Sequence, residues 1–173
     1  MKIKKELPLF EQKKAFIIVT GKQSAKIYLA SNGEINLVDE LYIPSPSSEY
    51  SDNEGHFKRR GSGGVISSGS VREPQKAYLF KKFSTELSKL IAKLDDKEKV
   101  QELYLFTPDY IKNNLRNSLT KLLQNKIVME IFGNYGDSHV FDLLKMINKE
   151  NEHFGATTPT TKEAQKLMQK KID

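Results

Sequence analysis

The fold of this chain depends on one stretch, Ala15-Phe16-Ile17-Ile18-Val19-Thr20. Its apolar residues follow one another without interruption, which is typical of a strand buried on both faces in the middle of a sheet. A turn at Thr20-Gly21-Lys22 and a second strand from Ser24 to Ala30 are expected next. Asn32-Gly33 then predicts a tight hairpin, because both turn positions accept positive φ. A third strand follows, with apolar residues at Ile35, Leu37 and Leu41.

The second half of the chain alternates helices and strands. Pro74 is expected at the first position of a helix whose apolar stripe runs from Ala77 to Leu94. A strand over Gln101 to Phe106 follows. Thr107-Pro108-Asp109 then predicts a helix start, in which the threonine hydroxyl caps, the proline lies in the first turn and the carboxylate faces the helix dipole.

The apolar stripe of this second helix is predicted at Ile111, Leu115, Leu119, Leu122 and Leu123. A fifth strand is expected over Ile127 to Phe132. Asn134-Tyr135-Gly136-Asp137 follows, either as part of a site at the strand ends or as a turn in which Asp137 or Ser138 caps a third helix. The apolar positions of that helix are Val140, Leu143, Leu144 and Ile147.

These elements predict an α/β fold. The fourth and fifth strands enter through helical crossovers, so they are expected to run parallel to each other and to a strand of the antiparallel meander. The result is a mixed five-stranded sheet with flanking helices, in one domain over residues 1–150. Residues 151–173 are expected to form an extension with a short amphipathic helix, opened by a capping box at Thr160 and Glu163. This helix packs either on the domain or on a second copy, which would make a homo-oligomer.

Composition excludes several classes of protein. The 173 residues contain no cysteine, so disulfides, thiol catalysis and cysteine-ligated zinc are excluded. No apolar run approaches the length of a membrane span, and the first residues lack the apolar region of a secretory signal. The expectation is therefore a cytoplasmic protein without membrane association.

The net charge of +6 is concentrated in one region. The segment 44–73 lacks periodicity, is rich in glycine and serine, and predicts a long loop. Between Gly55 and Lys82 there is a single acid, Glu73, against seven basic residues: Lys58, Arg59, Arg60, Arg72, Lys76, Lys81 and Lys82. Such a cluster favours a polyanion, most often a nucleic-acid backbone. The alternative is a solvated loop without a partner.

An ordered set of strings then suggests a family. They are Ser51-Asp52, Lys58-Arg59-Arg60-Gly61-Ser62-Gly63-Gly64, Leu103-Tyr104-Leu105-Phe106-Thr107-Pro108-Asp109-Tyr110 with Leu115, Lys126-Ile127-Val128 and Asn134-Tyr135-Gly136-Asp137. Over residues 13–148 the chain resembles the bacterial host attachment protein family. That family is similar to the middle domain of archaeal and eukaryotic class-1 peptide-chain release factors. The resemblance implies a ribonuclease H-like sheet topology.

The resemblance also implies a role for the loop. In the release factors a Gly-Gly-Gln tip enters the ribosome and promotes hydrolysis of peptidyl-tRNA, and the matching tip here is Gly63-Gly64-Val65. The glycines still allow bare backbone to approach RNA, but a valine cannot position a water as an amide can. We therefore expect a module that docks on the ribosome or on structured RNA such as tRNA or rRNA, without peptidyl-tRNA hydrolysis. The RNA-contacting residues expected are Lys58, Arg59, Arg60, Gly61, Gly63, Gly64 and Arg72. No catalytic residue, metal or cofactor is assigned.

Two other functions stay open. One is a protein-interaction or host-attachment domain that uses the loop or the final helix. The other is a hydrolase of unknown substrate at the strand ends near Thr107 and Tyr135. A two-metal nuclease fits less well, because the first strand carries no carboxylate. The remaining candidates for metal or acid-base chemistry are scattered along the chain: Asp39, Glu40, Asp109, Glu130, His56, His139 and His153.

Overall fold

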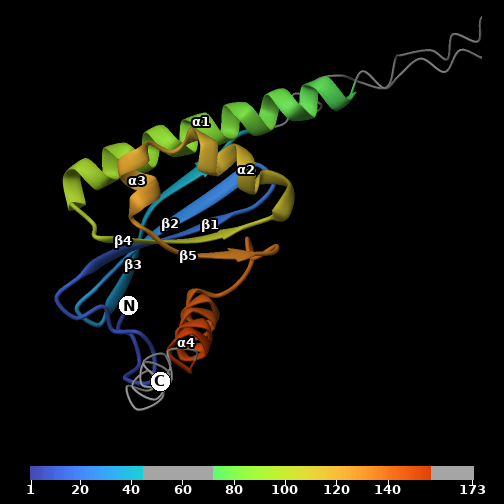
Figure 1. Cartoon of the computed structure of the whole chain (residues 1–173). Helices are drawn as coiled ribbons and strands as arrows, with labels where there is room; N and C mark the ends of the chain where they lie inside the picture. The colour runs from blue at the N-terminus through green and yellow to red at the C-terminus, as the bar shows by residue number, and fades with distance from the viewer. Residues whose placement is uncertain (45–71, 157–173) are drawn as a thin grey trace, which may run out of the picture.

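The structure, a computed structural model, describes residues 1–44 and 72–156, and the side chains of residues 1–44 and 77–152. In this part of the chain one sheet has the strand order β3-β2-β1-β4-β5 (Figure 1). The strands are β1 (Lys14–Thr20), β2 (Ser24–Ser31), β3 (Glu34–Tyr42), β4 (Glu102–Thr107) and β5 (Ile127–Phe132). β2 is antiparallel to both β1 and β3, whereas β1, β4 and β5 are parallel. The predicted mixed α/β sheet is confirmed, and its order is the ribonuclease H-like topology.

β1 is the central strand and is buried on both faces. Phe16 and Ile18 belong to the core on one side of the sheet, and Ala15, Ile17 and Val19 to the core on the other. These five residues are at most 3% exposed. Since successive side chains of a strand alternate between faces, burial on both sides requires the uninterrupted apolar run seen in the sequence.

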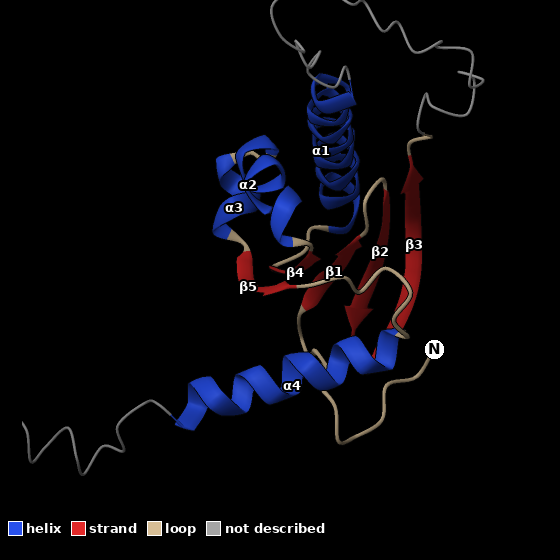
Figure 2. Cartoon of the chain, turned by 90° about the vertical axis from the view of Figure 1, so that its right-hand side faces the viewer, coloured by secondary structure: helices blue, strands red, loops and turns tan. Residues whose placement is uncertain are grey.

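Helices cover both faces of the sheet (Figure 2). The core on one side is closed by α1 (Arg72–Glu98), α2 (Asp109–Ser118) and α3 (Lys121–Asn125). α4 (Val140–Ala156) closes the other side and continues past residue 150, the predicted end of the domain. None of the helices in the described ranges combines the length and apolarity needed to cross a bilayer.

The turn between β2 and β3 is the predicted hairpin. Asn32 and Gly33 both have positive φ, at 48° and 77°. The N-terminal segment packs against this turn. The backbone N–H of Ile3 donates to the carbonyl of Gly33 at 2.7 Å, and the N–H of Gly33 donates to that of Leu9 at 2.7 Å. Residues that precede β1 therefore hold the hairpin from outside the sheet.

The start of α2 differs from the prediction. The local sequence predicts Thr107 as the cap of this helix, but the N-cap residue is Pro108, which makes no side-chain hydrogen bond. The hydroxyl of Thr107 instead lies 2.8 Å from the hydroxyl of Thr20. The prediction is wrong because the Thr107 hydroxyl forms a buried hydrogen bond with Thr20 of β1 and does not cap the helix.

The single helix predicted to run as far as Leu123 is divided in two. Leu119 has extended backbone (ψ 142°) and ends α2. Thr120 then caps α3 by accepting a hydrogen bond from the backbone N–H of Leu123. As a result Leu122, predicted on the buried stripe, is 76% exposed. A threonine at this point favours a new cap over a continued helix.

Two further helices begin differently from the prediction. α1 begins at Arg72, so Pro74 is within the first turn, where its missing N–H costs no intrahelical bond. At α4 the expected cap by Asp137 or Ser138 is not the one observed: the backbone N–H of Phe141 donates to Nδ1 of His139 at 3.3 Å. The final helix predicted after Thr160 lies outside the described residues.

Candidate nucleic-acid interface

The end of β3 and the start of α1, which flank the predicted basic loop, lie at one edge of the sheet. β3 runs in the same direction as β1, so its end at Tyr42 lies at the edge where β1 and β4 also end, here called the carboxyl edge. α1 starts at Arg72 and runs back toward the start of β4. A helix of 27 residues is about 40 Å long and a strand of 7 residues about 23 Å. The first part of α1 therefore projects beyond the strands (Figure 1).

The loop residues predicted to contact RNA are Lys58, Arg59, Arg60, Gly61, Gly63 and Gly64, and all lie outside the described residues, as does Val65. Arg72 is the first residue of α1, and its side chain is not among those described. These residues stay a prediction. The structure does describe the elements on either side of the loop, β3 before it and α1 after it.

The exposed face of α1 carries lysines that lengthen the basic region. We call four of them the basic stripe: Lys81, Lys82, Lys89 and Lys93. Lys82, Lys89 and Lys93 lie opposite the buried residues Phe83, Leu87 and Ile91 of the same helix, and Lys81 lies between these two faces, on the side of Ser84. Glu86 is paired with Lys89 at 2.9 Å. Sequence reasoning missed Lys89 and Lys93, although a helical projection of α1 around its apolar positions would have found them.

An aromatic contact joins α1 and α2 close to the carboxyl edge. The rings of Phe80 and Tyr110 have centroids 5.4 Å apart and are inclined by 39°. Phe80 is partly buried, whereas Tyr110 is 55% exposed. Burial of part of its ring raises the pKa of the Tyr110 phenol above its ordinary value. Sequence reasoning does not predict this contact, because its two residues come from different helices.

Serine residues hold α2 against α1 behind this aromatic pair. The Ser88 hydroxyl donates to the carbonyl of Ser118 at 2.7 Å, and the Ser118 hydroxyl lies 2.9 Å from the carbonyl of Ser84. Ser84 and Ser88 are buried. Small side chains allow the helices to approach closely, and bonds to opposite carbonyls fix their relative position. Tyr110 lies at the start of the helix whose last residue makes these contacts.

The other side of α2 is tied to the edge strand β5. Arg116 pairs with Glu130 at 3.0 Å, and the ammonium group of Lys112 lies 4.6 Å from the centroid of the Phe132 ring. Lys112 also pairs with Asp109 at 3.0 Å. Asp109 and Glu130, considered from the sequence as scattered carboxylates, therefore each face a cation. Within the described residues, no three His, Asp or Glu side chains are grouped so that they could hold a metal ion.

The strand ends near Thr107 and Tyr135 form a packed layer. The hydroxyls of Thr20 and Thr107 are buried and hydrogen-bonded to each other. The ring of Tyr135 packs edge-on against Phe106, with centroids 5.5 Å apart. Gly133, at φ 156°, leaves the space for that ring: a β-carbon there would lie 2.8 Å from it. The two threonines and Tyr135 are therefore engaged in packing at the carboxyl edge.

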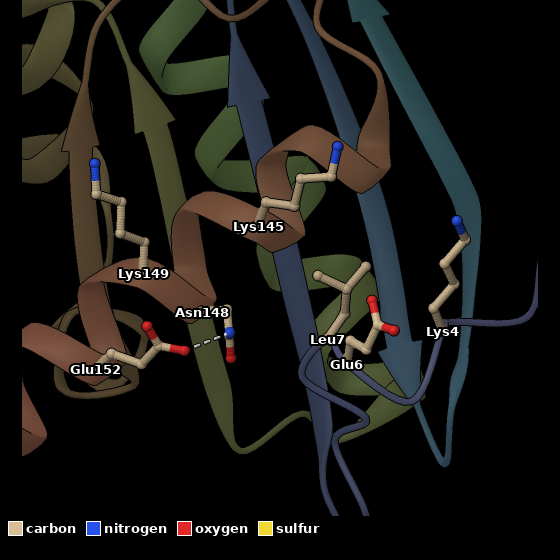
Figure 3. Close-up of a pocket in the computed structure, with 7 residues that line it drawn as sticks. All are labelled: Lys4, Glu6, Leu7, Lys145, Asn148, Lys149 and Glu152. Atoms are coloured by element: carbon tan, nitrogen blue, oxygen red, sulfur yellow. Dashed lines mark hydrogen bonds between the residues drawn. The ribbon is translucent and has the colours of Figure 1, made fainter.

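A shallow pocket of about 350 Å³ lies between the N-terminal segment and α4, on the face of the sheet opposite α1 (Figure 3). Its lining combines both charges, with Lys4, Glu6 and Leu7 from the N-terminal segment and Lys145, Asn148, Lys149 and Glu152 from α4. The amide of Asn148 donates to Glu152 at 2.9 Å. This pocket contains none of the residues predicted to contact RNA.

Comparison with known proteins found no matching family model and no matching curated protein. Among solved structures, the chain is similar to one described as an archaeal protein, with a TM-score of 0.42 and 14% identity over 84% of this chain and 41% of that one. It is also similar to the crystal structure of an archaeal translation termination factor, with a TM-score of 0.42 and 16% identity over 84% of this chain and 42% of that one. The chain thus spans about two fifths of the length of either protein.

Proposed function

We propose that this protein binds RNA, on the ribosome or on a structured RNA such as tRNA, through the basic loop and the basic stripe of α1. The observation that carries the proposal is the concentration of charge. Residues 55–82 hold seven basic residues and one acid, a local excess as large as the net charge of +6 of the whole chain. Clustered cations bind phosphate backbones because each contact releases condensed counterions.

The fold supports the same proposal. The loop follows β3, which ends at Tyr42, and precedes α1, which begins at Arg72. Both residues lie on the side of the sheet edge to which the first turns of α1 project. Lys81 and Lys82 are exposed on α1, and Lys89 and Lys93 continue the charge along the helix. The cations of the loop and of the helix can then face one extended polyanion.

The loop residues suggest binding without hydrolysis. Gly63 and Gly64 allow close approach of the main chain to RNA. Val65 stands where the resembled release-factor motif has glutamine, and an isopropyl group can neither accept nor donate a hydrogen bond to a reacting water. The proposed role is therefore docking on RNA, with no reaction at the peptidyl-tRNA ester.

The test compares two neutralised pairs of lysines. Lys81→Gln with Lys82→Gln removes two charges from the basic stripe, and Lys97→Gln with Lys99→Gln removes one from the last turn of α1 and one just after the helix, where both side chains are 76% exposed. Binding of purified ribosomes and of a tRNA is measured over a salt series. Removing two lysine–phosphate interactions is expected to reduce the slope of log affinity against log salt by about 1.4–1.8, because each contributes about 0.7–0.9. The first pair should show this reduction, and the second should match the wild type.

Three results would overturn the proposal. One is affinity that does not depend on salt, and another is an equal decrease in affinity from both lysine pairs. The third is full affinity after reversal of Arg59 and Arg60 to glutamate, since these two guanidinium groups are central to the predicted loop. Release of peptide from peptidyl-tRNA by the wild type would refute the non-hydrolytic part alone.

A further inference from the structure

We propose that Tyr110, supported by Phe80, stacks on an unpaired base, so that the interface prefers single-stranded or looped RNA to duplex RNA. This inference rests on the proposed function and specifies the kind of RNA. A base that is not paired offers a free aromatic face, whereas the bases of a duplex are stacked on each other.

The geometry of the aromatic pair carries the inference. Tyr110 packs against Phe80 with a centroid distance of 5.4 Å, and 55% of its surface is nevertheless exposed. The ring thus contacts Phe80 and still leaves more than half of the residue's surface available to a partner. Because α2 is bound to α1 through Ser84, Ser88 and Ser118, the ring needs little ordering when a base arrives.

A lysine follows the supporting ring directly in α1. Ser84 faces α2, and Lys81 stands one turn before it on the same side of α1, next to Phe80. Aromatic rings interleaved with cations are the combination that binds single strands, because the rings stack on bases while the cations contact phosphates. The exposed lysine at position 81 of α1 favours this occupant over an apolar protein surface.

The experiment uses the full chain and two RNA probes of equal length. One is a hairpin with 2-aminopurine in its loop, and the other is a fully paired duplex. Tyr110→Ala should weaken hairpin binding about tenfold, as expected when one base no longer stacks on a ring, and should change duplex binding less than about twofold. Tyr110→Phe keeps the ring and should bind as the wild type. Tyr110→Ala should also abolish the fluorescence quenching of 2-aminopurine on binding, which Tyr110→Phe should preserve.

Leu122→Ala is the matched control, because it removes a side chain that is 76% exposed on α3 without removing a ring. Tyr110→Leu keeps apolar area and should still fail to quench the probe. If Tyr110→Ala binds the hairpin as tightly as the wild type while the Lys81 and Lys82 variant binds it weakly, the stacking inference is wrong and the proposed function stands. If the wild type binds neither probe nor ribosomes, both fail.

Discussion

The ammonium group of Lys126 contacts both carboxylate oxygens of Asp95, at 2.6 and 2.8 Å, and so ties the end of α1 to the start of β5. The same carboxylate accepts the backbone N–H of Val100 at 3.1 Å. Asp95→Ala is expected to lower the free energy of unfolding by about 2 kcal/mol, since it leaves a half-buried ammonium group and an N–H without their partner. Urea denaturation measures this decrease. Lys97→Ala, which removes an exposed ion pair with Glu98, should cost under about 0.5 kcal/mol.

The buried pair of Thr20 and Thr107 provides a second prediction. Thr20→Val preserves shape but removes the hydroxyl that lies 2.8 Å from that of Thr107. The remaining buried hydroxyl should cost about 1–2 kcal/mol of unfolding free energy. The double variant with Thr107→Val should recover part of this stability, because no unpaired hydroxyl remains. If the double variant loses more unfolding free energy than the two single variants lose together, the hydroxyls have another role.

Gly133 is predicted to tolerate no side chain. Its φ of 156° lies outside the range that most residues adopt, and an added β-carbon would approach the Tyr135 ring to 2.8 Å. Gly133→Ala should therefore lower the thermal midpoint, with a cost of about 1–3 kcal/mol. Gly136→Ala is the matched control in the same loop, because its β-carbon would meet only Gly21, at 3.8 Å. Equal destabilisation by the two substitutions would contradict the prediction.

Tyr104 should make the protein sensitive to alkaline pH. Burial raises the pKa of its phenol, and a hydrogen bond to Glu102 at 3.0 Å acts in the same direction. The stabilisation by the neutral phenol is complete below the unfolded value of about 10 and is lost as the pH rises above it toward the folded pKa. The wild type should lose up to about 1.4 kcal/mol per pH unit from this group. Tyr104→Phe should show a shallower decline between about pH 10 and 11.5 in chemical denaturation, and an unchanged slope would refute the assignment.

The strands were predictable because their signals are local. The apolar run from Ala15 to Val19 and the Asn32-Gly33 turn each specify an element without reference to the rest of the chain, and both are observed. The errors arise where a distant group competes with a local preference. Thr107 has the chemistry of a helix cap, yet its hydroxyl faces Thr20, which stands 87 residues earlier.

The candidate interface was predictable only in part. The charge excess of residues 55–82 can be counted from the sequence, and the role of Lys58 to Gly64 is still a prediction from it. Tyr110 carries no such signal, since an isolated tyrosine at a helix start has many ordinary roles. Only its contact with Phe80 and its exposed surface distinguish it.

The strands and the concentration of positive charge could be read from the chain, because periodicity and charge are properties of neighbouring residues. Which of these segments meet depends on the three-dimensional arrangement. Parallel pairing of β1 with β4 requires a helical crossover, and this crossover carries α1 across the sheet to pack on α2. Phe80 and Tyr110 are adjacent for that reason, since chain topology, and not local preference, sets the contact between them.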